Sequence, residues 1–169
     1  MLTQAELKRV LSYDPATGIF IWIVARGRVS AGTIAGRVLI DRSDNLERRY
    51  VVITVNSRKY RAHRLAWLYV YGAWPDHGLD HRDTDGTNNR IDNLREATAT
   101  ENAQNMRRHA KNSSGIKGVF WNSDKGKWTV RIRVRGRNKH IGHFEDIDRA
   151  ADAYQTAATQ EFGEFARVA

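Results

Sequence analysis

The residues with the clearest capacity for chemistry lie between positions 80 and 102. His81 directly follows Asp80, and an imidazole whose unperturbed pKa lies near 6.5 can accept a proton at physiological pH. Asp80 offers a carboxylate oxygen and Asn102 an amide oxygen, which are ligands that hard divalent cations prefer. The chain has 0 cysteines, so a metal must be held by His, Asp, Glu or Asn side chains. These residues predict a general base beside one divalent ion, with Mg²⁺ preferred and Mn²⁺ as the alternative.

The spacing around these residues forms a specific pattern. Residues 80–86 read Asp-His-x-Asp-x-Asp-Gly, residues 88–94 read Asn-Asn-x-x-x-Asn-Leu, and a helix with a capping box follows. An isolated Asp-His pair is usually solvated and inert, and asparagine-rich loops are usually turns, but the combination is hard to obtain by accident. In this pattern residues 61–105 resemble the HNH nucleases.

The resemblance implies a ββα-metal unit, in which two short strands and a helix converge on a single divalent ion. His81 is then the general base that activates water for cleavage of a phosphodiester bond. Asp80 and Asn102 would hold the metal. Asn93 would bond the base and fix its orientation, and Asn89 would brace the loop.

Hydrophobic periodicity indicates the elements that position this motif. The expected elements are a helix at 3–12, a strand at 19–24, a hairpin with strands at 50–55 and 60–63, a helix at 62–71, a polar loop at 76–92 and a helix at 99–109. His63 falls at the junction of hairpin and helix, where a supporting structural role and a contact to phosphate both remain open.

The last third of the chain has a different pattern. Strands are expected at 118–122, 127–135 and 139–144, and an alanine-rich helix at 147–162. Because side chains alternate along a strand, the middle strand turns one set toward the helix and the other away from it. The apolar set is Trp128, Val130, Ile132 and Val134, and the opposite set is Thr129, Arg131, Arg133 and Arg135.

Residues 113–167 resemble the APETALA-two or ethylene-response-factor DNA-binding domain. The resemblance is carried by Ile116-Lys117-Gly118-Val119, Gly126-Lys127-Trp128 and Ile141-Gly142-His143-Phe144. It implies that the arginine face of the sheet enters a major groove. The DNA-binding residues expected from it are Lys117, Arg131, Arg133, Arg135, Lys139 and His140. Phe120 departs from the pattern, since plant members tend to carry arginine there, so no base preference is carried over.

These patterns predict an α+β fold, in which a ββα-metal nuclease domain precedes a small three-stranded antiparallel sheet packed on one helix. The expected boundaries are 1–48 for an N-terminal α/β segment of unassigned role, 49–108 for the nuclease domain, 109–114 for a linker and 115–169 for the DNA-binding domain.

Composition favours a nucleic-acid partner. Lys and Arg number 28 against 19 Asp and Glu, which gives a net charge of +9 and a polyanion as the natural partner. A membrane is disfavoured, because the longest apolar stretch falls far short of the roughly 20 residues needed to span a bilayer. The start of the chain does not resemble a signal peptide, so we expect a cytoplasmic protein of a bacterium or a phage-infected cell.

The function expected from the sequence is metal-dependent cleavage of double-stranded DNA by an endonuclease of the homing type, targeted by its C-terminal domain. Two alternatives remain open. One is a sequence-specific DNA-binding protein with an inactive nuclease segment, and the other is an RNA-directed nuclease of HNH type, because phosphates carry much of the affinity for either polymer. The sequence leaves open whether the protein is a monomer or a homodimer.

Overall fold

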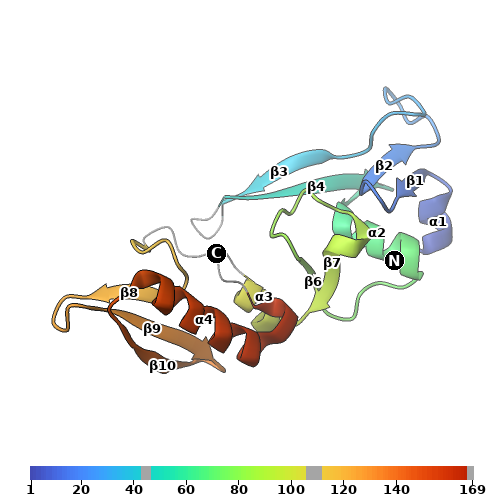
Figure 1. Cartoon of the computed structure of the whole chain (residues 1–169). Coiled ribbons are helices and arrows are strands. Elements are labelled where there is room, and N and C mark those ends of the chain that lie inside the picture. The colour runs from blue at the N-terminus through green and yellow to red at the C-terminus, as the bar shows by residue number, and fades with distance from the viewer. Residues whose placement is uncertain (43–46, 106–111, 167–169) are drawn as a thin grey trace. The chain divides into compact units, whose positions relative to one another are not determined.

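The computed structural model describes residues 1–42, 47–105 and 112–166. The chain forms two compact units, Met1–Ala97 and Thr98–Ala169, which are called the N-terminal and the C-terminal unit below (Figure 1). Each unit mixes helices with antiparallel sheets, so the α+β class is confirmed. Residues 106–111, which span the end of the expected nuclease domain and the start of the expected linker, lie outside the described residues.

The N-terminal unit contains three small antiparallel sheets, of which two are hairpins and one has three strands in the order β3-β4-β5. Its elements are α1 (Gln4–Lys8), β1 (Leu11–Asp14), β2 (Ile19–Trp22), β3 (Arg37–Asp41), β4 (Arg48–Val55), β5 (Arg58–Arg61), α2 (Ala62–Tyr71), β6 (Gly78–His81), the 3-10 turn η1 (Ile91–Asn93) and β7 (Leu94–Ala97).

The first helix is shorter than the periodicity predicted. A capping box between Thr3 and Glu6 starts α1 as expected, but the helix ends at Lys8. From Leu11 the chain is a strand, in which Leu11 pairs with Trp22 and Tyr13 with Phe20, and these four side chains are buried. Pairing with β2 therefore outweighs the weak helix preference of this segment.

The periodicity did not predict β3 or β6, although the HNH resemblance implied two short strands at the motif, and β5 is shifted. β3 lies in a stretch with little apolar alternation, and β6 lies inside the expected polar loop, and each forms because a partner strand pairs with it. The β4–β5 turn consists of Asn56 and Ser57 alone, both with positive φ (48° and 62°), as a two-residue hairpin requires. Consequently β5 begins at Arg58, two residues earlier than predicted.

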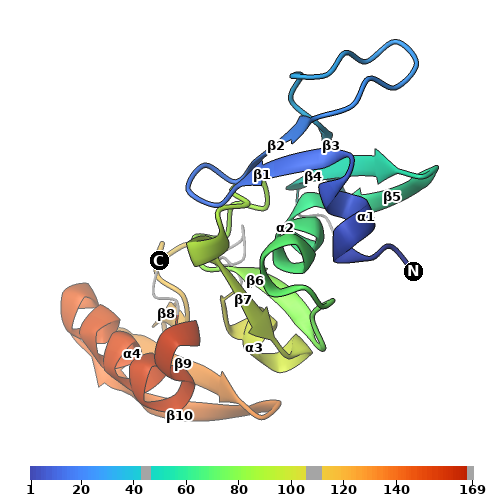
Figure 2. The ribbon, with the colours of Figure 1, turned by 90° about the vertical axis from the view of Figure 1, so that its right-hand side faces the viewer.

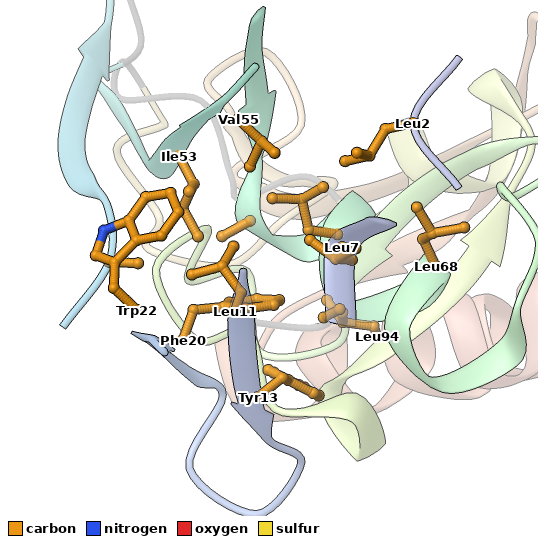
Figure 3. Close-up of a cluster of buried hydrophobic side chains, with 14 residues drawn as sticks. Leu2, Leu7, Leu11, Tyr13, Phe20, Trp22, Ile53, Val55, Leu68 and Leu94 are labelled. Carbon is orange, nitrogen blue, oxygen red and sulfur yellow. The ribbon is translucent and has the colours of Figure 1, made fainter. Parts of the chain in front are cut away.

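One hydrophobic core joins the N-terminal elements of this unit to α2. α1 packs beside α2 (Figure 2). Leu7, Leu11 and Phe20 lie in one buried cluster with Leu68 of α2, and they are completely or almost completely buried (Figure 3). Burial of side chains of this size contributes roughly 1.5–3 kcal/mol each. The cluster members between Leu2 and Ala35 are therefore packed into the same unit as the HNH-like motif.

The C-terminal unit contains α3 (Ala99–Asn105), β8 (Val119–Asn122), β9 (Lys127–Val134), β10 (Arg137–Phe144), α4 (Ile147–Phe162) and the 3-10 turn η2 (Gly163–Phe165). As predicted, a three-stranded antiparallel sheet, ordered β10-β9-β8, packs on one helix. Val130 and Ile132 of β9 lie against Ala150, Tyr154 and Ala158 of α4 in a separate buried cluster.

A glycine permits the close contact between the start of β8 and α4. Gly118 has a φ of +74°, and a Cβ there would lie 2.2 Å from the ring of Tyr154 and 2.4 Å from the carbonyl oxygen of Arg131. A larger residue at this position would force the sheet and the helix apart.

Candidate functional site

The β6–β7 hairpin presents the central pair of the motif. Asp80 pairs across the hairpin with Arg95, and His81 pairs with Leu94. Asp80 and His81 are only 5% and 6% exposed. A buried polar pair at the end of a short strand must be held by specific partners, because an unsatisfied charge in the interior is strongly unfavourable.

Arg95 holds Asp80, and the sequence analysis did not foresee this contact. The Nε and Nη2 atoms of Arg95 donate to Oδ2 of Asp80 at 3.0 and 2.8 Å, and both side chains are 6% exposed. Two hydrogen bonds from one guanidinium to the same carboxylate oxygen fix the orientation of the carboxylate. Only the β6–β7 register brings the two residues together, so the sequence offered no local pattern from which to find Arg95.

The ring of His81 packs against two other rings. The ring of His63 meets it edge-on at 4.9 Å between centroids, and the ring of Tyr50 lies 6.4 Å away. Burial lowers the pKa of His81 below 6.5, and the nearby side chains of Asn89, Asp83, Asp80 and Asp85 partly oppose this effect. The net result is an imidazole that is neutral at neutral pH, as a general base requires.

His63 lies behind His81 at the start of α2. It is 5% exposed, and burial, followed by the repulsion between the protonated forms of the two histidines, lowers its pKa from 6.5 to about 3. Its Nδ1 atom has no hydrogen-bond partner among the described residues. A buried neutral ring in this place favours the supporting role over a direct contact to phosphate.

The side chains of loop 82–90 and η1 form a hydrogen-bond network. Asn93 donates from Nδ2 to Oδ1 of Asp83 at 3.0 Å and to the carbonyl oxygen of Asn88 at 2.9 Å, and its Oδ1 accepts from the Asp83 amide at 3.1 Å. Asn88 in turn donates to Oδ2 of Asp83 at 2.6 Å. These contacts brace the loop that follows His81, whereas an orienting bond from Asn93 to His81 stays a prediction.

The β1–β2 hairpin, called the N-terminal hairpin below, supports the same loop and η1 from one side. The hydroxyl of Tyr13 donates to the carbonyl oxygen of Asn89 at 2.6 Å, and the amide of Ile91 donates to the carbonyl oxygen of Pro15 at 3.2 Å. At Gly18, whose φ is +74°, a Cβ would lie 2.5 Å from the backbone of Asn89 and Arg90. Backbone of the N-terminal hairpin therefore touches backbone of the loop directly.

β4 supports the loop from another side. A Cβ on Gly86 would lie 2.3 Å from the carbonyl oxygen of Arg49 and 2.7 Å from the ring of Tyr50. The side chain of Asn89 is buried, and its Nδ2 donates to the carbonyl oxygen of Thr87 at 2.9 Å. This position agrees with a bracing role for Asn89.

The two expected metal ligands belong to different units. Asp80 lies in the N-terminal unit, while Asn102 lies exposed on α3 of the C-terminal unit. The backbone N–H of Asn102 donates to the carbonyl oxygen of Thr98 at 2.9 Å. Within the described ranges, no group of three or more His, Cys, Asp or Glu could hold a metal. The expected set, one carboxylate and one amide, needs no such group, and its oxygen ligands suit a hard cation.

The outer face of the C-terminal sheet carries part of the expected basic set. Arg131 and Arg133 are exposed on the side of β9 that faces away from α4, and His140 pairs with Arg131 and so shares that side. The guanidinium of Arg131 lies 5.0 Å from the ring centroid of Phe120. The aromatic ring that departs from the family pattern thus packs against an arginine of this face.

The other basic residues of that set lie elsewhere. Lys139 pairs with Ile132, on the side of the sheet that faces α4, and its Nζ binds Oε1 of Glu161 at 2.7 Å. Arg135 was expected within the strand, but it lies in the β9–β10 turn with a φ of 49°. Lys117 lies before β8 and donates to the carbonyl oxygen of Gln104 at 2.6 Å.

Comparison with known proteins gives two matches. The HNH endonuclease family matches residues 60–104. Protein 3.8 of Escherichia phage T7 is 31% identical over 108 residues, which cover 63% of this chain and 88% of the phage protein. No solved structure matches the chain. No helix in the described part of the chain is long and apolar enough to cross a membrane.

Proposed function

Because this chain carries an HNH endonuclease domain and belongs to the same family as Protein 3.8 of Escherichia phage T7, we propose that it hydrolyses phosphodiester bonds of double-stranded DNA. The observation that carries the proposal is the buried pair at the end of β6. There a neutral His81 lies next to an Asp80 whose carboxylate is fixed by Arg95.

In the proposed reaction His81 takes a proton from water, whose oxygen forms the new bond to phosphorus while the bond to the leaving oxygen breaks. His63 and Tyr50 pack against the imidazole ring and limit its movement. The loop braced by Asn93 and Asn89 keeps the strand end in place. Asp80, with Asn102, would hold one Mg²⁺ or Mn²⁺, and the ion would supply positive charge to the phosphate during the reaction.

The C-terminal sheet is the proposed targeting element. Its outer face presents Arg131, Arg133 and His140, and arginine forks can bond guanine edges in a major groove or phosphate oxygens along it. A homing-type endonuclease combines cleavage with such recognition. We propose that this protein acts in the cytoplasm of a bacterium or of a phage-infected cell.

The test is incubation of the purified chain with supercoiled plasmid, with and without Mg²⁺ and Mn²⁺, beside the His81→Ala variant. Relaxed circles show nicking of single strands, and linear products show paired cuts. Metal-dependent products that the variant does not form support the proposal. A plasmid that is bound but never cut would instead favour a DNA-binding protein with an inactive nuclease segment, and cleavage of duplex RNA alone would favour the RNA-directed alternative.

A further inference from the structure

One face of the β3–β4–β5 sheet is rich in basic side chains. Residues that pair across strands share a face of the sheet, and along β4 the residues alternate between faces. Val52 of β4 has Arg37 of β3 on one side and Arg61 of β5 on the other. By the same register this face, called the Arg37 face below, carries Arg37, Leu39, Asp41, Arg48, Tyr50, Val52, Thr54, Lys59 and Arg61.

The C-terminal half of β4 turns its opposite side to the core. Ile53 and Val55 of β4 are 1% exposed and lie in the main hydrophobic cluster, and Val51 packs against it. On the Arg37 face, by contrast, Arg37, Lys59 and Arg61 are exposed. β4 therefore turns Ile53 and Val55 to the core, while the exposed Arg37, Lys59 and Arg61 lie on the other side of the sheet.

The Arg37 face leads to the candidate general base. The guanidinium of Arg61 lies 4.2 Å from the ring centroid of Tyr50. The same ring lies 5.9 Å from His63 and 6.4 Å from His81. A polyanion that contacts Arg61 is therefore separated from His81 by one aromatic ring, a distance of a few phosphate repeats along a nucleic-acid strand.

The one acidic side chain of this set forms a partly exposed ion pair with Arg61. Asp41 lies 3.6 Å from Arg61, and both side chains are roughly half exposed (39% and 47%). An ion pair in such a position contributes little, because water screens both charges. A phosphate can therefore compete with this carboxylate for the guanidinium of Arg61, because arginine binds phosphate as readily as carboxylate.

We propose that the Arg37 face binds the phosphate backbone of duplex DNA next to the bond that is cut. This inference rests on the nuclease function proposed above. It gives a role to part of the chain that precedes the HNH-like motif. With the C-terminal sheet as the first DNA-contacting surface, the Arg37 face of the N-terminal unit would be the second. Charge complementarity selects the occupant, since basic side chains outnumber the one acidic side chain on this face and duplex DNA carries a charge at about every 1.7 Å of its axis.

The test is a salt-dependent binding titration of the full chain on a short duplex, without divalent metal, for Arg37→Ala and Lys59→Ala. Arg58→Ala is the matched control, because Arg58 is exposed on the same strand as Lys59, and its side chain is on the opposite face. Each test variant is expected to raise the Kd several-fold, and to lower the slope of log K against log salt by about 0.9 per lost phosphate contact. The control is expected to behave like the wild type.

Single-turnover cleavage of a saturated duplex separates this inference from the nuclease proposal. If the wild type cuts DNA, the Arg58→Ala control should cut at the wild-type rate, since Arg58 lies on the opposite face of the sheet. A wild type that binds but does not cut would reject the nuclease proposal, while the altered salt slopes would still support the surface. Equal losses in all three variants, or no loss in Arg37→Ala and Lys59→Ala, would overturn the surface.

Discussion

The hydroxyl of Tyr13 donates a 2.6 Å hydrogen bond to the backbone carbonyl of Asn89. The bond joins residues 76 positions apart and is buried. It connects the N-terminal hairpin to the loop that follows His81. Burial also raises the pKa of Tyr13, so its hydroxyl stays a donor across the working pH range.

We expect Tyr13→Phe to lower the turnover rate about tenfold and to leave DNA affinity unchanged. The ring keeps its contacts with Phe20 and Tyr69, but the carbonyl of Asn89 loses its donor and the loop loses one of its supports. The buried unsatisfied carbonyl should also cost about 1–3 kcal/mol of unfolding free energy. Single-turnover kinetics and urea unfolding measure the two effects. Tyr69→Phe, in the same aromatic group, is the control, and equal behaviour of the two variants would contradict a positioning role for Tyr13.

His81→Ala should abolish cleavage and leave DNA binding almost intact, because a general base acts on the transition state and adds little to ground-state binding. His77→Ala is the matched control, since His77 is exposed just before β6. Cleavage and binding are measured on the same duplex. A rate within about threefold of the wild type would remove His81 from the role of base.

Asp80→Ala should raise the Mg²⁺ concentration needed for cleavage and reduce the maximal rate, because the proposed set loses its one carboxylate. It should also destabilise the chain by about 3–5 kcal/mol, since Arg95 would remain buried without its partner. Asp80→Asn keeps the shape of the side chain and serves as the second variant if Asp80→Ala unfolds. The measurements are a Mg²⁺ titration of cleavage and urea unfolding, and an unchanged titration in a folded variant would refute the metal-ligand role.

The free energy of unfolding should fall as the pH drops from about 6.5 toward 3. The pKa of His63 is about 3 in the folded chain and near 6.5 in the unfolded chain, so within this window the unfolded state binds the extra proton. His63→Leu should remove up to about 1.4 kcal/mol per pH unit of this dependence. Urea unfolding at pH 7.5 and 5.5 compares the variant with the wild type, and identical pH slopes would contradict a buried neutral His63.

Replacing Arg131 and Arg133 together by Ala should weaken DNA binding and lower the salt slope by roughly 0.9 per lost phosphate contact. If the two arginines read bases, discrimination for the true site should fall by about 1–3 kcal/mol for each bidentate pair. Cleavage of a short, saturating duplex should survive. Lys139→Ala is the control, because Lys139 faces α4 and binds Glu161. Normal affinity with lost cleavage would show that the arginines belong to the active site itself.

The sequence by itself determined the elements whose patterns are local. Alternation in β9 and helical periodicity in α4 placed the C-terminal sheet and helix within one or two residues. The two capping boxes marked the starts of α1 and α3. The spacing of Asp80, His81 and Asn93 indicated the nuclease motif, because these residues are near neighbours along the chain.

Only the tertiary structure decided which distant residues support that motif. The hydrogen bonds from Arg95 to Asp80 depend on the register of β6 and β7. The contacts of Tyr13 and Gly18 with loop 82–90 depend on how the distant β1–β2 hairpin packs. The same holds for Lys139, whose side of the sheet became clear only from its pairing with Ile132 and its bond to Glu161. The physical reason is that periodicity reports which side chains of one element share a face, whereas register and packing are set by contacts between elements far apart in the sequence.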